Sequence, residues 1–193
     1  MGRPKQLLMV EGRPLLELVV SRANASSLDE VVVVLGAAAD EIQRSAEFGR
    51  ATVIVNPDHA AGMSTSLRVG LHSVGRDVER AMVILGDQPG VSPELIEGLL
   101  EIQTASRLPA AALSFDGMLH PPVLLDRSLW PEIETLEGDV GYRQLMRGRP
   151  EIVATLPAPA GGRQPVDVDT PDDYRRLLAS TPATASPRRR KID

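Results

Sequence analysis

Cysteine is absent from the 193 residues, and aromatic residues make up only 3% of them. The lack of cysteine excludes disulfides, thiolate zinc sites and cysteine nucleophiles. Scarce aromatic rings disfavour the stacking platforms that bind single-stranded nucleic acids. A net charge of -5 disfavours binding to phosphate backbones in general. We therefore expect no nucleic-acid partner.

Long apolar runs are also lacking. No stretch approaches the ~20 consecutive apolar residues that a membrane span requires. The first residues, MGRPKQLLMVEG, lack the continuous apolar core of a signal peptide. These observations predict a soluble, cytoplasmic protein without a membrane partner.

Three widespread signatures of nucleotide-binding and hydrolytic enzymes are missing. The sequence has no G-x-x-x-x-G-K-[ST] phosphate loop, no G-x-G-x-x-G fingerprint at the start of a helix and no G-x-S-x-G nucleophile elbow. A P-loop NTPase is thereby excluded, and a standard dinucleotide-binding motif is absent.

Short apolar runs rich in β-branched residues recur along the chain, mostly as continuous blocks. Such blocks are typical of strands buried on both faces of a largely parallel sheet. The expected strands cover 31–35, 52–55, 81–85, 110–115 and 122–125.

Stretches of helical period lie between these strands, and Ser92 followed by Pro93 is a good N-cap and first turn. The expected helices cover 14–25, 40–47, 93–100, 128–136, 142–147 and 171–179. Strands that alternate with helices predict an α/β fold with a Rossmann-like, doubly wound, mostly parallel sheet. Functional loops then lie at the carboxyl ends of the strands.

The chain has no internal repeat and no linker that would divide it. We expect one domain over residues 1–179, with a loop at 156–162. Residues 180–193 are rich in Ser, Thr, Pro and Ala and end in a basic cluster, RRRK, followed by Ile and Asp. Such a segment cannot bury a core, so a disordered basic tail is predicted.

Asp87 is the leading candidate for a metal ligand. It follows an apolar strand in the sequence GDQP, where Gly86 permits close approach of a ligand and Pro89 ends the strand. One carboxylate together with substrate phosphates is a common way to hold Mg²⁺. The alternative is a simple turn cap, since Asp after a strand often serves that purpose.

A second acidic segment, VDVDTPDD, covers residues 166–173. Its alternation directs Asp167 and Asp169 to one side of an extended segment. Paired carboxylates repel each other, and a divalent cation relieves that repulsion. Asp169 is the better candidate because it ends the segment at a helix entrance, whereas Asp172 and Asp173 are explained by the dipole of that helix.

Two further segments contain groups suited to phosphates. Arg3 and Lys5 flank Pro4 near the amino end, and both side chains bind phosphate. Gly62 precedes a run of hydroxyl residues that includes Ser66, and the amides of a helix beginning there would face a nucleotide. The alternatives are an ordinary exposed terminus and capping by Ser64 or Thr65.

His120 precedes two prolines that fix the backbone ahead of a strand. Its imidazole is a candidate for contact with an acceptor substrate. A lone histidine is more often structural or merely exposed.

Seven segments taken in order resemble the molybdenum cofactor cytidylyltransferases of the MobA-like NTP transferase domain family. They are GRPKQLL, VVVVLG, VNPDHAAGMSTSLRVGL, LGDQPGVSPELI, HPPVLLDRSLWPEI, LEGDVGYRQLM and VDVDTPDDY, which together span about residues 1–178. Each motif is weak alone, but their order is specific to the family.

This resemblance implies Mg²⁺-dependent transfer of NMP from an NTP, with CTP favoured, to a phosphorylated acceptor such as molybdopterin cofactor. Lys5, helped by Arg3, would neutralise the triphosphate, and Gly62 and Ser66 would lie along the nucleotide. Asp87 and Asp169 match the two metal-side carboxylates of the family. By the same resemblance, His120 and Asp139 lie near the acceptor, and a molybdoenzyme is a possible partner.

Two departures from the family pattern stand out. Family members have an apolar strand and a Leu-Ala-Ala-Gly-type loop ahead of the segment that begins here at Met1. We expect that Met1 is an internal methionine and that coding sequence continues upstream. The second departure is Leu119 before His120, where a glycine is more common, and it leaves the acceptor open.

Two other functions compete with transfer. One is an NAD(P)H-dependent oxidoreductase, because relatives of the family are described as such. The other is an inactive nucleotide-binding or chaperone-like module. Loss of activity with EDTA is expected of the transferase and not of hydride transfer.

Overall fold

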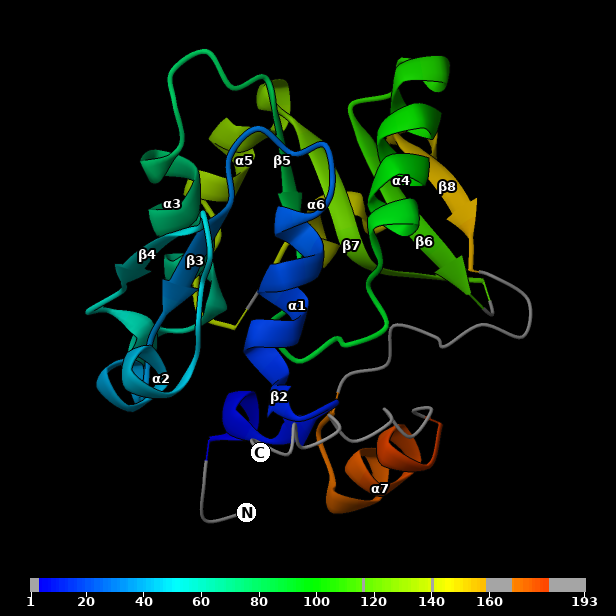
Figure 1. Cartoon of the computed structure of the whole chain (residues 1–193). Coiled ribbons are helices and arrows are strands. Elements are labelled where there is room, and N and C mark those ends of the chain that lie inside the picture. Colours follow the sequence, from blue (N-terminus) through cyan, green and yellow to red (C-terminus); the bar gives the residue numbers. More distant parts are fainter. Residues whose placement is uncertain (1–3, 116, 140, 159–167, 181–193) are drawn as a thin grey trace, which may run out of the picture.

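A computed structural model describes residues 4–115, 117–139, 141–158 and 168–180 (Figure 1). The expected α/β fold is confirmed. The strands are β1 (Met9–Val10), β2 (Arg13–Pro14), β3 (Val32–Leu35), β4 (Thr52–Val55), β5 (Arg80–Val83), β6 (Ala110–Phe115), β7 (Met118–Asp126) and β8 (Val153–Pro157). The α-helices are α1 (Leu15–Asn24), α2 (Ala39–Ser45), α3 (Met63–Ser73), α4 (Pro93–Ser106), α5 (Trp130–Glu134), α6 (Arg143–Met146) and α7 (Pro171–Ser180), with short 3-10 turns η1 (Lys5–Leu7), η2 (His59–Ala61), η3 (Arg127–Leu129) and η4 (Pro150–Ile152).

The described strands form three separate sheets. The largest has the order β5-β7-β6-β8, while β3 pairs with β4 and β1 pairs with β2 in a hairpin. The β3–β4 and β6–β8 pairs are parallel, but β7 is antiparallel to both of its neighbours. The larger sheet is therefore mixed, whereas the sequence predicted a mostly parallel one.

Helices cover both faces of the four-stranded sheet. On one face α4 packs Leu95 and Leu99 against Leu124 and neighbouring residues. On the other, α3 and α5 contribute Leu67 and Ile133 to the largest apolar cluster. Figure 1 shows α4 in front of this sheet and α5 behind it. This is the doubly wound arrangement expected from the sequence.

Burial differs between the strands. Residues 110–113 of β6 and 121–125 of β7 are buried, as the continuous apolar blocks predict. Val32 and Val34 of β3 and residues 81–85 in and after β5 are only half-buried. For these the prediction of burial on both faces is wrong. Within the described residues β3 pairs with β4 alone and β5 with β7 alone, so each strand keeps an open edge.

The local start signal of α4 is confirmed. The helix begins at Pro93, and the Ser92 hydroxyl accepts a hydrogen bond from the Leu95 amide at 3.3 Å. At the end of the chain the prediction of a loop from residue 156 is wrong, because Leu156 and Pro157 complete β8. This strand pairs with β6 and buries Val153 and Ala154, a tertiary contact with no local signal in the sequence.

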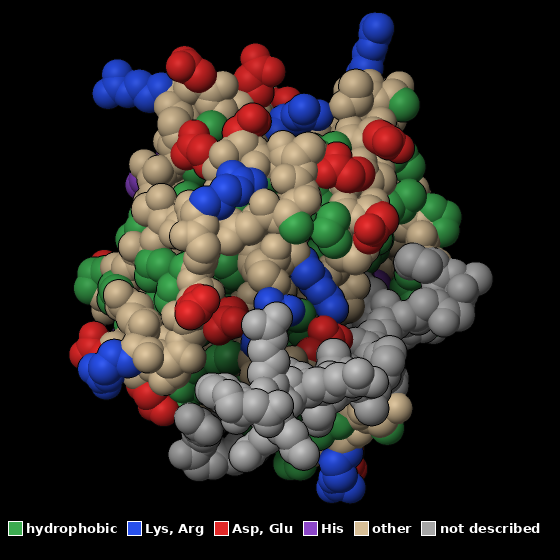
Figure 2. All heavy atoms as spheres, in the orientation of Figure 1, with side chains coloured by type: hydrophobic (Ala, Val, Ile, Leu, Met, Phe, Trp, Pro, Cys, Tyr) green, Lys and Arg blue, Asp and Glu red, His purple; other side chains and the backbone are tan. Residues whose placement is uncertain are grey.

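Charged side chains are interspersed by sign over the face shown in Figure 2, which agrees with the modest net charge. In the part of the chain that the structure describes, none of the helices has the length and apolarity needed to cross a membrane. Of the expected tail, Ser180 ends α7, and 181–193 lie outside the described residues.

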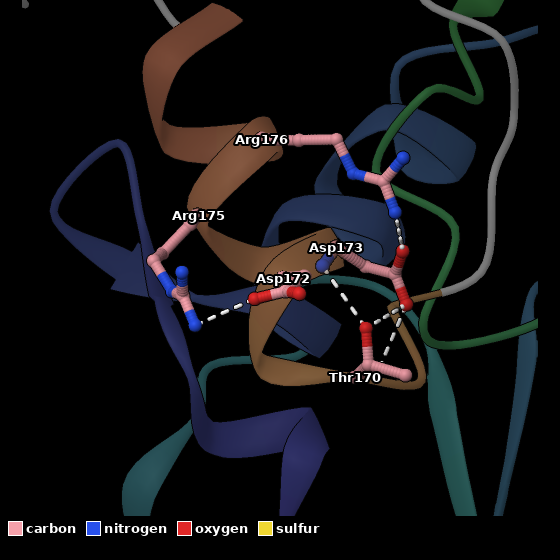
Figure 3. Close-up of polar contacts among 5 residues, drawn as sticks. All are labelled: Thr170, Asp172, Asp173, Arg175 and Arg176. Carbon is pink, nitrogen blue, oxygen red and sulfur yellow. Dashed lines mark hydrogen bonds and ion pairs between the residues drawn. The ribbon is translucent and has the colours of Figure 1, made fainter.

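Helix α7 begins with a reciprocal cap at Thr170 (Figure 3). The Asp173 carboxylate accepts hydrogen bonds from the Thr170 amide at 2.8 Å and hydroxyl at 2.7 Å. The Thr170 hydroxyl in turn accepts from the Asp173 amide at 3.1 Å. Arg176 adds an ion pair to Asp173 at 2.7 Å, and Arg175 pairs with Asp172. These contacts satisfy amides at the helix start that would otherwise lack partners.

This cap makes a prediction about acid stability. Hydrogen bonds from Thr170 hold the pKa of Asp173 below its ordinary value. Because the folded pKa is the lower one, Asp173 stabilises the fold above about pH 4, the unfolded pKa, and that contribution disappears as the pH falls through the folded pKa. Urea unfolding should show Asp173→Ala less stable than the parent at pH 7, with the difference shrinking towards pH 3. Asp172→Ala, which loses an exposed ion pair, serves as the control. A difference that grows on acidification would contradict the prediction.

Candidate functional site

Lys5 lies between the two carboxylates that the sequence singles out. Its Nζ is 2.5 Å from Asp87 Oδ2 and 2.9 Å from Asp169 Oδ1. The Asp87 side chain is 13% exposed, whereas that of Asp169 is 64% exposed. Residues from both ends of the chain and from the middle therefore meet at one cation, beyond the carboxyl end of β5.

Helix α1 holds the loop that carries Asp87. The Arg22 guanidinium donates hydrogen bonds to the carbonyls of Pro89 and Val91, the latter at 3.2 Å. At Gly86 an added Cβ would lie 2.8 Å from Leu16 Cδ1, so this glycine lets the loop approach α1 closely. The loop therefore contacts α1 both before Asp87, at Gly86, and after it, at Pro89 and Val91.

Asp169 is positioned by its neighbour Val168. The Val168 amide donates to the Asp87 carbonyl at 3.2 Å, and its side chain is buried against Val10, Leu15 and Leu18. These contacts bind the segment before α7 directly to the Asp87 loop.

The two carboxylates change the pKa of Lys5. Desolvation of the partly buried ammonium, the largest single effect, lowers the pKa of Lys5. Hydrogen bonds and charge attraction from Asp169 and Asp87 together outweigh that desolvation, so its pKa lies above the ordinary value. Lys5 is therefore a fixed cation at neutral pH, suited to attract phosphate oxygens.

The same carboxylates fit a hard divalent cation. Magnesium is commonly held by one or two carboxylates plus substrate phosphates. Asp87 and Asp169 supply oxygen donors that already converge on one positive charge. Among the described residues no group of three or more His, Cys, Asp or Glu side chains could hold a metal. The remaining ligands would have to come from phosphate and water.

A second group of residues surrounds the start of α3. Gly62 has φ +109° and ψ 174°, and an added Cβ would lie 2.2 Å from the Gly138 carbonyl carbon. The Ser64 amide donates to the Gly138 carbonyl at 3.1 Å. Side-chain capping by Ser64 or Thr65, the alternative raised from the sequence, is not seen, because α3 begins at Met63 with Gly62 as its N-cap residue, and both hydroxyl residues lie inside the first turn.

Asn56, at the end of β4, is buried and orients two hydroxyls of α3. Its Nδ2 donates to Thr65 Oγ1 at 2.8 Å and to Ser66 Oγ at 3.0 Å. Its Oδ1 accepts from the Asp58 amide at 2.9 Å. A cavity of about 810 Å³ extends from Ser66 to Gly86, the residue before Asp87. Lys5, Asp87 and Asp169 are not among the residues that line this cavity, which therefore approaches the lysine cluster only as far as Gly86.

His120 lies at the same end of the sheet as Asp87. In the β5–β7 register Val83, the last residue of β5, faces Val123, which follows His120 by three residues on β7. Its Nε2 is buried without a hydrogen-bond partner among the described residues, and its ring meets Phe115 edge-on. Within the described part of the chain, no hydrogen bond or ion pair joins His120 to Lys5, Asp87 or Asp169.

The remaining predicted residues differ in how far they can be placed. Asp139 is exposed, in the loop that lies against the start of α3. Arg3 and Asp167 lie outside the described residues.

Two positioning residues, Arg22 and Asn56, were not predicted from the sequence. Asn56 follows an apolar strand much as Asp87 does, and that position was the available signal.

The α/β fold and the contact of Lys5 with Asp87 and Asp169 agree with the arrangement that the sequence resemblance led us to expect. The sequence of residues 1–155 matches the family model described as the MobA-like NTP transferase domain, and the chain belongs to that family.

Curated relatives carry more than one activity in their names. The chain is 32% identical over 187 residues to a nicotine blue oxidoreductase of Paenarthrobacter nicotinovorans, covering 92% of this chain and 90% of that protein. It is 30% identical over 105 residues to a 3-deoxy-manno-octulosonate cytidylyltransferase of Synechococcus elongatus, covering 54% of this chain and 42% of that enzyme.

Solved structures agree on the fold. Rv0371c of Mycobacterium tuberculosis H37Rv, in a complex with manganese, superimposes with a TM-score of 0.80 at 30% identity and covers 92% of both chains. A nucleotidyl transferase of Methanothermobacter, Mth528, gives a TM-score of 0.75 at 20% identity, covering 91% of this chain and 83% of that one. The fold is that of the nucleotide-diphospho-sugar transferases, and the family supports a nucleotidyltransferase-type function.

Proposed function

We propose that the protein transfers NMP, with CTP favoured as donor, to a phosphorylated acceptor such as molybdopterin cofactor and releases pyrophosphate. The observation that carries the proposal is the meeting of Asp87 and Asp169 at Lys5. The cytidylyltransferase among its relatives supports cytidine as the base. A Mycobacterium tuberculosis structure that contains manganese supports a divalent ion, for which Mg²⁺ is the proposed species here.

Each residue of the cluster has a distinct proposed role. Asp87 and Asp169 would hold Mg²⁺, which supplies charge neutralisation at the phosphates when bound. Lys5 would stabilise the negative charge that develops on the leaving pyrophosphate. The attacking phosphate oxygen of the acceptor is already ionised near neutral pH, so no general base is needed. Positioning and electrostatics then account for the rate.

The start of α3 would take the nucleotide. Gly62, whose missing side chain admits the Gly138 carbonyl, and the Ser66 hydroxyl, which accepts a hydrogen bond from Asn56, would lie along the ligand. Arg3 would add charge to the triphosphate side. His120 and Asp139 are proposed to contact the acceptor. A pterin-type acceptor would be consistent with eventual delivery to a molybdoenzyme.

A second candidate is an oxidoreductase. The relative from Paenarthrobacter nicotinovorans that matches 92% of this chain is named for oxidation and reduction of nicotine blue. The same nucleotide site would then hold NAD(P)H. The lysine–carboxylate cluster favours metal-dependent transfer over this alternative.

One experiment separates these functions. Thermal unfolding of the chain should be recorded with CTP, GTP, ATP and NADPH, each with and without Mg²⁺. The transferase predicts stabilisation by CTP only with the metal, and pyrophosphate release that EDTA abolishes. Stabilisation by NADPH that EDTA leaves unchanged would favour the oxidoreductase. A melting temperature unmoved by every ligand would favour an inactive module.

Lys5 itself provides a test of the metal site. Because its ammonium occupies the point where both carboxylates converge, Lys5→Met should bind Mn²⁺ more tightly than the parent in the absence of nucleotide, on the order of tenfold. Electron paramagnetic resonance of free Mn²⁺ measures this. Arg13→Met removes an exposed cation elsewhere and should leave the affinity unchanged. Equal affinities in parent and Lys5→Met would argue against a metal at the Lys5 position.

A further inference from the structure

The position of the Asp169 carboxylate depends on the backbone on either side of it. Its side chain is 64% exposed and contacts Lys5 at 2.9 Å. On the amino side, the buried Val168 donates its amide to the Asp87 carbonyl at 3.2 Å. On the carboxyl side, Asp169 is followed directly by Thr170, which caps α7. An exposed carboxylate next to a helix cap moves with that helix, so whatever holds α7 in place also holds Asp169.

Helix α7 packs against the rest of the protein through few side chains. Figure 1 shows it at the lower end of the molecule, beyond the β1–β2 hairpin. Within residues 171–179 every side chain is exposed or half-buried, and Tyr174 and Leu177 pack against the apolar cluster around Val10. The cap and ion pairs drawn in Figure 3 lie within the helix and its N-cap, so they stabilise α7 without attaching it. An element with so few buried apolar contacts is typical of the regions that open locally.

A hydrogen bond from Tyr174 joins α7 to the hairpin. The Tyr174 hydroxyl donates to the Met9 carbonyl at 2.7 Å, across 165 residues of sequence. The preceding carbonyl, that of Leu8, accepts from the Leu15 amide at 2.8 Å across the hairpin, so the Met9 carbonyl points to its outer side. The Leu8 amide in turn donates to the Lys5 carbonyl at 3.1 Å. Tyr174 therefore holds α7 against the strand that directly follows the turn carrying Lys5.

We propose that docking of α7 on the β1–β2 hairpin completes the metal site, and that Tyr174 is the positioning residue that holds α7 there. This inference rests on the proposed function, because it assigns Asp169 to the metal. The Val168 amide and the Tyr174 hydroxyl attach the α7 segment at two separate points, so the docked helix cannot turn about either one. When α7 undocks, Asp169 moves away with it and the site retains Asp87 alone. The docking equilibrium of α7 therefore regulates how tightly the site binds a divalent ion.

Tyr174→Phe tests this proposal, because it removes the hydroxyl and keeps the ring in the apolar cluster. Nuclear magnetic resonance of the metal-free protein should show about fivefold faster hydrogen exchange at the Val168 amide, the factor that corresponds to one typical hydrogen bond. Electron paramagnetic resonance of Mn²⁺, without nucleotide, should show a dissociation constant raised by about two- to fivefold. Leu178→Ala, which shortens a side chain that is 43% exposed on the same helix, should change neither quantity.

The same substitution in an Asp169→Asn background separates positioning from a general loss of stability. If Tyr174 acts through Asp169, Tyr174→Phe should not weaken Mn²⁺ binding any further in that background, whereas it should still speed exchange at Val168. A general loss of stability would weaken binding by the same factor in both backgrounds.

Three results would overturn the proposal. They are parental Mn²⁺ affinity in Tyr174→Phe, parental exchange at the Val168 amide, and an equal loss of affinity in the Asp169→Asn background. Failure of the proposed function would look different. The parent would then bind Mn²⁺ no more tightly than Asp87→Asn, which would overturn the metal site and its regulation together, while exchange at Val168 would still respond to Tyr174→Phe.

Discussion

Asp87→Asn should reduce the rate of nucleotidyl transfer by at least about 10³-fold while leaving the fold intact. The substitution keeps the shape of a side chain that is 13% exposed but removes the charge that would hold the metal and that faces Lys5. Lys5 retains Asp169 as a partner, so the melting temperature should change little. Pyrophosphate release at saturating CTP and Mg²⁺ measures the rate, and calorimetry measures the melting temperature.

Asp172→Asn is the matched control for this experiment. Asp172 lies only three residues after Asp169, but it pairs with Arg175 on the surface of α7 (Figure 3). We expect near-parental turnover for this variant. An Asp87→Asn protein that keeps more than a tenth of the parental rate would remove Asp87 from the proposed mechanism.

Gly62→Ala should destabilise the fold far more than either aspartate substitution. With φ +109° and ψ 174° the residue occupies a region that is essentially restricted to glycine. A Cβ would also lie 2.4 Å from the Gly138 carbonyl oxygen, so the loop that carries Asp139 would have to move. We expect a loss of about 3 kcal/mol or more in the free energy of unfolding, equivalent to at least about 6 °C in melting temperature.

Gly12→Ala separates backbone strain from the clash with Gly138 as causes of the lost stability. Gly12 also has a positive φ, +78°, but nothing lies within 4 Å of the Cβ that it would gain. Its cost should be confined to backbone strain, about 1 kcal/mol. Urea unfolding of both variants checks the difference. Equal losses would mean that the contact between Gly62 and Gly138 contributes nothing.

Apolar runs and capping residues correctly predicted the strands and helices that depend mainly on neighbouring residues in the sequence. The strand at 110–115 was predicted correctly because its apolar run is also buried in the structure. The cap was predicted correctly because Ser92 acts on amides only a few residues away. The β8 strand was missed because its five residues form a strand only through pairing with β6. The β1–β2 hairpin was missed for a similar reason, since two-residue strands have no detectable periodicity.

The candidate site shows the same division. Lys5, Asp87 and Asp169 were selected by residue type and resemblance, and the structure places them in contact, while their roles remain predictions. Arg22 could not be recognised, because its function depends on a carbonyl 67 residues away. The half-burial of β3 and β5 could not be predicted either, because an apolar run does not show whether another strand pairs with each of its edges.

The contact between Lys5 and Asp169 spans 164 residues of sequence. During synthesis the first partner therefore leaves the ribosome long before the second has been translated. Loop closure over such a distance is slow compared with helix or hairpin formation. If Asp169 has its proposed role, the growing polypeptide stays catalytically silent until that residue has emerged and reached Lys5.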